Sequence, residues 1–203
     1  FRKDLILWVE STIYDHRYQS SFLSYYKKFL ISLSNRFLVP GTMSRRYLES
    51  FKVKYEDIWI ARNAVESKRF AGNAKDSEYE EKFLKLLCVS RLEEHKGILD
   101  LFKAIQSLNQ EGIRSELDIL GSGPQEKKLK DFIEKNGLTN IKMHGFLQQS
   151  ELKHFYSKAS LFIMPSHSDP WGLVINEALS SGVPVIASVK AGGTCDLIIN
   201  DYN

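Results

Sequence analysis

Residues 166–177, which read SHSDPWGLVINE, hold the densest group of polar side chains and free backbone groups in the sequence. Asp169 and Pro170 have the order of a helix cap followed by proline at the first helical position. A helix that begins there presents unpaired amides and the positive end of its dipole, which together attract an anion such as phosphate. The amides concerned are those of Gly172, Leu173 and Val174, and Gly172 has no side chain to block a phosphate.

Glu177 follows about two turns further along the same predicted helix. Carboxylates accept hydrogen bonds from sugar hydroxyls, so Asp169 and Glu177 beside an anion site suit a ligand that carries both phosphate and hydroxyl groups. The simpler alternative is that Asp169 is only a helix cap and Glu177 only a solvated helix residue. Glu177 stands among apolar neighbours, where an unsatisfied carboxylate is costly, and this favours a role for it.

A second candidate loop carries positive charge, which could bind the phosphate groups of the same ligand. Arg91 follows an apolar run and Lys96 precedes the next predicted helix. The guanidinium fork of arginine fits phosphate oxygens and lysine adds a compact point charge, so the two suit a diphosphate. The alternative is a pair of solvated surface charges, one of them bonded to Glu93 or Glu94.

Four further residues follow predicted strands and are candidate ligand contacts. Gly121 and Gly123 allow close backbone approach, although a G-x-G without a third glycine is a weak signal and a plain turn is the alternative. Phe146 can lie against a nucleotide base, with a core position as its alternative. Ser166, at the start of the first segment, is counted among the contacts as well.

The elements that must position these residues alternate between strand and helix. Short apolar runs predict strands, and apolar residues at spacings of three and four predict helices. Predicted strands cover residues 5–9, 36–39, 57–61, 84–90, 117–120, 141–144, 161–164 and 183–187. Predicted helices cover residues 20–33, 44–51, 97–110, 125–135, 151–159 and 171–181. The pattern predicts an α/β fold, a Rossmann-like parallel sheet with helices on both faces, and ligands at the carboxyl ends of the strands.

The polar, aperiodic stretch at residues 66–79 predicts a linker. We therefore expect one domain over residues 1–63, a linker over 64–83 and a second domain over 84–203. Both ends of the chain are expected to be truncated. Glu10, Ser11 and Thr12, after the first predicted strand, are expected to border the cleft between the domains.

The amino-acid composition limits which partners and cellular environments the sequence favours. The 203 residues are 43% hydrophobic and 26% charged, with a formal net charge of +3, too small an excess to argue for a nucleic acid partner. Two cysteines without metal-ligand spacing favour a reducing cytoplasm over a disulfide framework, and Cys88 reads as a small buried hydrophobe. No apolar run is long enough to span a membrane.

Taken together, the stretches VSRLEEHKG (89–97), LDILGSGP (117–124), HGF (144–146), LFIMPSHSDPWGLVINEALSSGVPVIAS (161–188) and AGGTCDLI (191–198) occur in the order found in one family. The sequence resembles the carboxyl-terminal half of the GT-B fold of the retaining glycosyltransferases called group 1 or family 4. Residues 84–203 resemble it strongly, as the nucleotide-sugar donor domain. Residues 1–63 resemble it weakly, as the tail of the amino-terminal, acceptor-side domain.

The resemblance implies a role for each candidate residue. Arg91 and Lys96 would bind the donor diphosphate and neutralise the leaving nucleotide, and Glu177 would hold the ribose hydroxyls. Asp169 would lie near the donor sugar, where the family usually has Glu, so a different sugar or a weaker contact is expected. The remaining donor contacts would be Gly121, Gly123, Phe146, Ser166 and the amides of Gly172, Leu173 and Val174.

The implied reaction moves a sugar from a UDP- or GDP-sugar to a hydroxyl of a glycan or lipid-linked acceptor, with retention at the anomeric carbon and no obligate metal ion. The implied location is the cytoplasm, with its membrane face as an alternative. Two other functions stay open: a nucleotide-sugar epimerase, and a module that binds donor without turnover. The predicted helix at 20–33 carries aromatic and lysine residues, and packing against the sheet is favoured over peripheral membrane contact.

Overall fold

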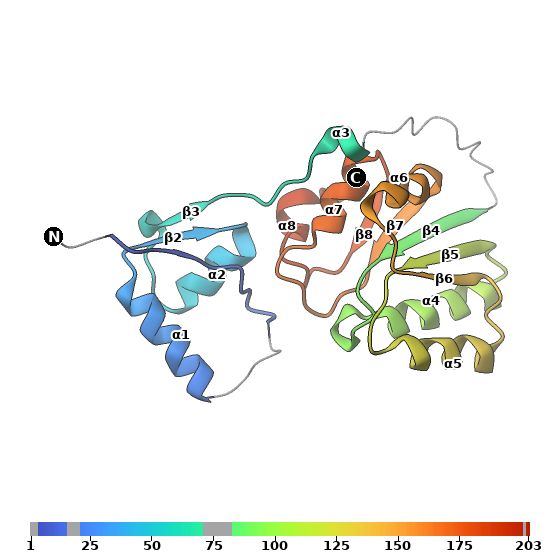
Figure 1. Ribbon diagram of the computed structural model, residues 1–203, viewed down its shortest axis with the longest axis horizontal. Coiled ribbons are helices and arrows are strands. Elements are labelled where there is room, and N and C mark those ends of the chain that lie inside the picture. The colour runs from blue at the N-terminus through green and yellow to red at the C-terminus, as the bar shows by residue number, and fades with distance from the viewer. Residues whose placement is uncertain (1–3, 16–20, 71–82, 201) are drawn as a thin grey trace.

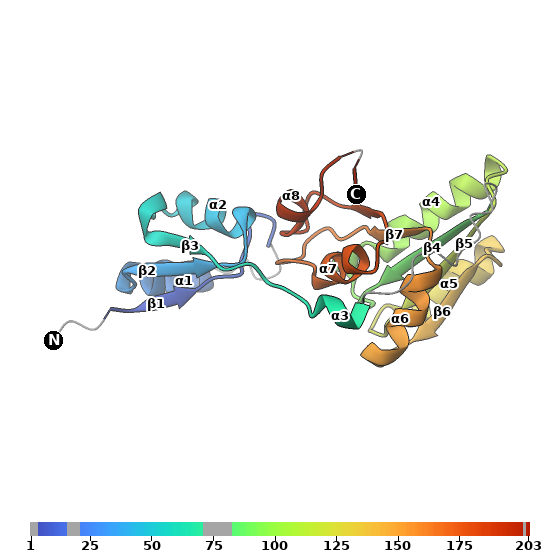
Figure 2. The ribbon, with the colours of Figure 1, turned by 90° about the horizontal axis from the view of Figure 1, so that it is seen from above.

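The computed structural model describes residues 4–15, 21–70, 83–200 and 202–203. In this part of the chain the strands form two separate parallel sheets, each with its own helices (Figure 1). The two lobes lie side by side along the long axis of the molecule (Figures 1 and 2). Every strand pair is parallel, which confirms the α/β class that the alternation of elements predicts.

The first sheet has the order β1-β2-β3, with β1 at Ile6–Trp8, β2 at Arg36–Val39 and β3 at Ile58–Ile60. Its helices are α1 (Ser21–Leu33), α2 (Thr42–Ser50) and the short 3-10 helix η1 (Tyr55–Asp57). The strand predicted over 5–9 is present as β1, but an apolar run of this kind suits a buried strand, whereas Ile6 is 55% and Trp8 43% exposed. Among the described strands β1 pairs with β2 alone, and an edge strand buries less of its surface than a central one.

The second sheet has the order β6-β5-β4-β7-β8. Its strands are β4 (Leu84–Val89), β5 (Ser115–Leu120), β6 (Ile141–Gly145), β7 (Leu161–Met164) and β8 (Val185–Ala187). Its helices are η2 (Glu94–Lys96), α4 (Ile98–Gln110), α5 (Glu126–Asn136), α6 (Gln149–Lys158), α7 (Leu173–Ser180) and α8 (Thr194–Leu197). Each strand predicted over 84–187 is present within a few residues of its expected bounds.

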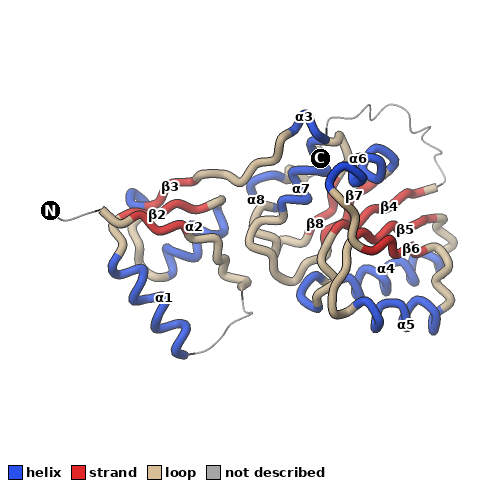
Figure 3. The backbone as a smooth tube through the Cα atoms, viewed as in Figure 1, coloured by secondary structure: helices blue, strands red, loops and turns tan. Residues whose placement is uncertain are grey.

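The core of this lobe lies on both faces of the sheet. Side chains of a strand alternate between faces, and β4 sends Leu86 and Cys88 into one apolar cluster and Leu87 into another. The first cluster contains residues of α4 and α5, and the second contains residues of α6 and α7. Figure 3 shows these two helix pairs on opposite sides of the strands. Cys88 is buried as predicted, and burial raises the pKa of its thiol to about 12.

Two helix starts differ from the sequence-based expectation. The helix predicted over 151–159 begins two residues earlier, at Gln149, because the side chains of its cap Gln148 and of Glu151 form a reciprocal capping box. The cap of α7 is Gly172, not Asp169, and Gly172 has a left-handed backbone with φ of 85°. The helix therefore begins after Pro170 rather than at it.

The predicted linker contains a helix. Residues Ser67–Phe70 form α3, and Phe70 is only 2% exposed because it packs into the core of the second lobe. The segment that joins the two sheets is thus anchored at this point. The rest of the linker prediction, residues 71–82, lies outside the described residues.

The lobes also touch where the carboxyl ends of their strands meet. Asp196 of α8 accepts hydrogen bonds from the amide of Thr42 at 2.8 Å and from its hydroxyl at 2.7 Å. A side-chain carbon on Gly41 would lie 2.5 Å from the Trp171 ring, so glycine is needed at this contact. The Thr12 side chain lies next to Gly192, so one of the three polar residues after β1 contacts the second lobe.

Candidate active site

The strand order reverses at β4 in the second sheet. From β4 the chain adds β5 and β6 on one side and β7 and β8 on the other. The loops that leave β4 and β7 at their carboxyl ends therefore diverge across a crevice, the usual ligand site of an open α/β sheet. Lys96 comes from the loop after β4 and Asp169 from the loop after β7.

Lys96 and Asp169 form a buried ion pair at this point. The Lys96 ammonium bonds Asp169 Oδ2, and their side chains are only 10% and 13% exposed. The other Asp169 oxygen accepts a hydrogen bond from the Trp171 amide at 3.1 Å. Sequence reasoning assigned both residues to the site but did not predict that they pair. Two charges removed from water need each other and their hydrogen bonds, so the pair fixes both loops.

Backbone contacts hold the loop after β4 close to the loop after β7. The amide of His167 donates to the carbonyl of His95 at 2.8 Å. Gly97 has a left-handed backbone with φ of 68°, and a side-chain carbon there would lie 2.3 Å from the Pro165 carbonyl oxygen. Only glycine allows this approach, and it brings Lys96 to Asp169.

Arg91 lies apart from the buried pair. Its guanidinium is exposed and bonds Glu93 at 2.8 Å, which is the alternative that the sequence left open. An exposed ion pair of this kind contributes little to stability. The cost of exchanging Glu93 for a phosphate is therefore small.

Helix α7 supplies the second part of the site. Gly172 is the cap, and the amides of Leu173 and Val174 stand in the first turn, where a helix has no acceptors for them. Glu177 is half-buried, and its Oε2 accepts a hydrogen bond from the Tyr156 hydroxyl at 2.9 Å. Burial raises the pKa of Glu177 and the Tyr156 bond opposes that rise. Glu177 is thus no ordinary solvated helix residue, and Tyr156 is a partner that sequence reasoning missed.

The loop after β5 is a structural turn in this state. A side-chain carbon on Gly121 would lie 1.8 Å from the Ser90 carbonyl oxygen, and one on Gly123 would lie 2.6 Å from that of Leu92. The amide of Leu92 also donates to Ser122 at 3.0 Å. The two glycines therefore allow close contact between the loops after β4 and β5, which agrees with the alternative of a plain turn.

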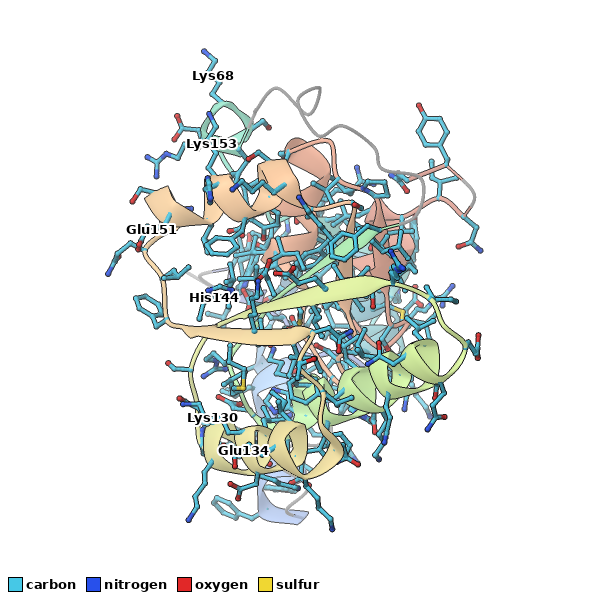
Figure 4. The ribbon with its side chains drawn as sticks, turned by 90° about the vertical axis from the view of Figure 1, so that its right-hand side faces the viewer. Lys68, Lys130, Glu134, His144, Glu151 and Lys153 are labelled. Atoms are coloured by element: carbon cyan, nitrogen blue, oxygen red, sulfur yellow. The ribbon has the colours of Figure 1, made fainter. Side chains whose placement is uncertain are left out.

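The loop after β6 carries an exposed aromatic. Phe146 is 69% exposed, so the alternative of a core position is wrong. His144, one residue before Gly145, points away from this loop: its ring bonds Asp118 at 2.5 Å and lies edge-on to Phe155. Figure 4 shows His144 on the outer strand, between α6 and α5.

Two serines of the loop after β7 are buried. Ser166 is 1% and Ser168 6% exposed. Within the described residues the Ser168 hydroxyl has no hydrogen-bond partner. A buried hydroxyl without a partner costs about 1–3 kcal/mol, so this loop gains from any group that can bond it.

A cavity of about 590 Å³ adjoins the loop after β4. Its wall includes Gly97, Asp100 and His167, and the last two are bonded at 2.8 Å. Lys96 and Asp169 are not among the residues that line this cavity.

Two negative findings concern the described residues. No three His, Cys, Asp or Glu side chains in this part of the chain gather as metal ligands would. None of its helices has the length and apolar character needed to cross a bilayer.

Two Rossmann-like parallel sheets that face each other across a cleft define the GT-B architecture. Solved structures share it. The chain is similar to HepE of Anabaena, in complex with UDP and glucose, at a TM-score of 0.80 and 20% identity, over 100% of this chain and 57% of that one. It is also similar to WaaG, a glycosyltransferase involved in lipopolysaccharide biosynthesis, at a TM-score of 0.73 and 16% identity, over 95% of this chain and 58% of that one.

Residues 71–203 match the family model of the glycosyl transferases group 1, and the chain belongs to this family. A relative from Erwinia amylovora, the amylovoran biosynthesis glycosyltransferase AmsK, is 31% identical over 144 residues, 68% of this chain and 35% of AmsK. The glycogen synthase of Mycobacterium tuberculosis is 31% identical over 161 residues, 79% of this chain and 38% of the synthase. The chain thus spans somewhat more than a third of the length of these relatives.

Proposed function

We propose that this chain carries the donor site of a retaining glycosyltransferase that moves a sugar from a UDP- or GDP-sugar to a hydroxyl of a glycan or lipid-linked acceptor. The observation that carries the proposal is the buried Lys96–Asp169 pair at the point where the strand order reverses. Family membership and the UDP and glucose bound to the similarly folded HepE support a nucleotide-sugar donor.

In this proposal each partner of the pair has a role. When a donor binds, the Lys96 ammonium turns from Asp169 to the diphosphate, and the amides of Gly172, Leu173 and Val174 complete the anion site from the start of α7. Asp169, released from Lys96, accepts a hydrogen bond from the donor sugar. Because one ion pair is exchanged for another, the buried ammonium keeps a counter-charge throughout.

Catalysis on this proposal is leaving-group stabilisation and positioning. Lys96 and Arg91 neutralise the charge that develops on the nucleoside diphosphate as the bond to the sugar breaks, so no metal ion is assigned to the step. Glu177 holds the ribose hydroxyls, and exposed Phe146 lies against the base. Holding the donor sugar next to the acceptor hydroxyl lowers the barrier further by fixing the reacting groups in place.

The acceptor side of the proposal draws on relatives. Several are named for amylovoran or colanic acid biosynthesis, which supports a role in making a polysaccharide. A lipid-linked acceptor would place the reaction at the cytoplasmic face of a membrane. The sequence favours packing of α1 against the sheet, but its side chains Phe22, Tyr25, Tyr26 and Phe29 are exposed beside Lys27 and Lys28, which supports peripheral contact there.

Product analysis tests the reaction. UDP-glucose, UDP-galactose and GDP-mannose are incubated with the protein, with and without an oligosaccharide acceptor, and the anomeric configuration is measured by NMR. The proposal predicts transfer from an α-linked donor to an α-linked product. A β-linked product contradicts retention, an altered nucleotide sugar without acceptor identifies an epimerase, and binding without turnover identifies a donor-binding module.

A further inference from the structure

The Tyr156 ring is completely buried in the core formed by α3, α6, α7 and β7, yet its hydroxyl donates a hydrogen bond to the carboxylate of Glu177. Phe70 meets the ring edge-on, with centroids 5.9 Å apart and an interplanar angle of 86°. Phe162 packs against it at 5.9 Å. The ring therefore has little freedom, and its hydroxyl is held in one place.

The hydroxyl bonds one oxygen of Glu177, and the other oxygen, Oε1, has no hydrogen bond to the part of the chain that the structure describes. Tyr156 donates to Glu177 Oε2 at 2.9 Å, across from α6 to α7. A carboxylate on a single helix rotates about three side-chain bonds, and this bond removes that freedom. It also favours the ionised form of a half-buried group whose pKa is raised by burial.

We propose that Tyr156 is a positioning residue that fixes Oε2 of Glu177, so that Oε1 is presented to the ribose hydroxyls of the bound nucleotide. The inference rests on the proposed donor-binding function. Tyr156 touches no ligand itself. Its contribution is to keep the acceptor of the ribose hydrogen bond oriented and charged before the nucleotide arrives, which is where preorganisation adds affinity.

The same geometry links the site to the segment that joins the two lobes. Phe70 is the last residue of α3, and it packs against the Tyr156 ring, whose hydroxyl bonds Glu177. Phe70, the contact of the joining segment with the second lobe, is therefore connected through Tyr156 to Glu177, the proposed ribose contact.

Tyr156→Phe tests the role because it removes the hydroxyl and keeps the buried ring. The probes are UDP and GDP and their 2′,3′-dideoxy forms, which lack the groups that Glu177 would bond, and affinities are measured by calorimetry. Tyr55→Phe makes the same chemical change on an exposed ring of the first lobe and serves as the matched control. The unfolding temperature without ligand reports whether each variant is folded.

We expect the wild type and Tyr55→Phe to prefer the ribonucleotide by about tenfold or more, as the loss of a charge-assisted bond implies. Tyr156→Phe should lose most of this preference while its affinity for the dideoxy form stays the same. An equal loss for both forms means that Tyr156 only supports the fold, and an unchanged preference means that it does not position Glu177. Either result overturns the inference alone, whereas a wild type that binds none of the four probes overturns the donor-binding function with it.

A second variant keeps the test decisive if Tyr156→Phe fails to fold. Glu177→Gln retains an acceptor for the Tyr156 hydroxyl but loses the charge. It should show the same loss of preference for the ribonucleotide. In a folded double variant the two losses should not add, because both substitutions remove one and the same contact.

Discussion

Removing either partner of the Lys96–Asp169 pair should destabilise the chain far more than removing both. Lys96→Met and Asp169→Asn each keep the shape of the side chain, and Asn keeps an oxygen for the Trp171 amide. Each leaves the other charge uncompensated in a place where the side chains are only 10% and 13% exposed. Breaking a buried pair in this way costs about 3–5 kcal/mol.

The double variant Lys96→Met, Asp169→Asn leaves no buried charge and should lie within about 1–2 kcal/mol of the wild type. Urea unfolding of the four proteins gives the coupling free energy between the two residues, which we expect to be about 4 kcal/mol or more. For a chain of this length the single variants should also melt roughly 6–20 °C lower. Single variants as stable as the double, or losses that simply add, would refute the view that the pair is buried and mutually dependent.

Three further predictions concern other parts of the site. Burial raises the pKa of Glu177 above its ordinary value, so the folded state holds its proton over a pH range where the unfolded state has lost it. Stability should therefore fall as pH rises through that range, and nucleotide affinity should rise as the carboxylate forms. Glu177→Gln should abolish both trends, and denaturation and calorimetry at a series of pH values would detect a trend that persists. Gly121→Ala should cost about 3 kcal/mol or more, because the new carbon meets the Ser90 carbonyl oxygen. Gly112→Ala, also at positive φ but in open space, should cost about 1–2 kcal/mol in the same urea titration, and equal losses would count against the close approach. Phe146→Ala should leave stability within about 0.5 kcal/mol and weaken UDP or GDP binding about tenfold or more, and unchanged affinity would remove Phe146 from the base contact.

Local patterns were enough to predict much of the fold. Apolar runs and helical spacing are read within one element, and each predicted strand of the second lobe is present. Strand ends of a parallel sheet meet at one edge, so the candidate loops could be chosen before their contacts were known. The Lys96 loop and the Asp169 loop were therefore correctly grouped.

The rest depends on contacts between distant residues. Lys96 and Asp169 are 73 positions apart, and their pairing depends on the glycine that lets the two loops approach. Helix α3 is stabilised where Phe70 enters a core built from the second half of the chain. Tyr156 reads as an ordinary apolar residue of an amphipathic helix, and only the packing of α6 beside α7 makes its hydroxyl a partner of Glu177. The start of α7 was misplaced because Gly172 adopts its left-handed backbone against Met164.

Our central proposal is that the Lys96–Asp169 pair opens to hold a nucleotide-sugar donor, with Lys96 on its diphosphate and Asp169 on its sugar. Calorimetric titration of UDP and GDP tests it most directly, on the wild type and on the double variant Lys96→Met, Asp169→Asn, which keeps the fold without the charges. We predict that the wild type binds at least one of the two nucleotides and that the double variant binds neither. Wild-type affinity in the double variant, or no binding by the wild type, would contradict the claim.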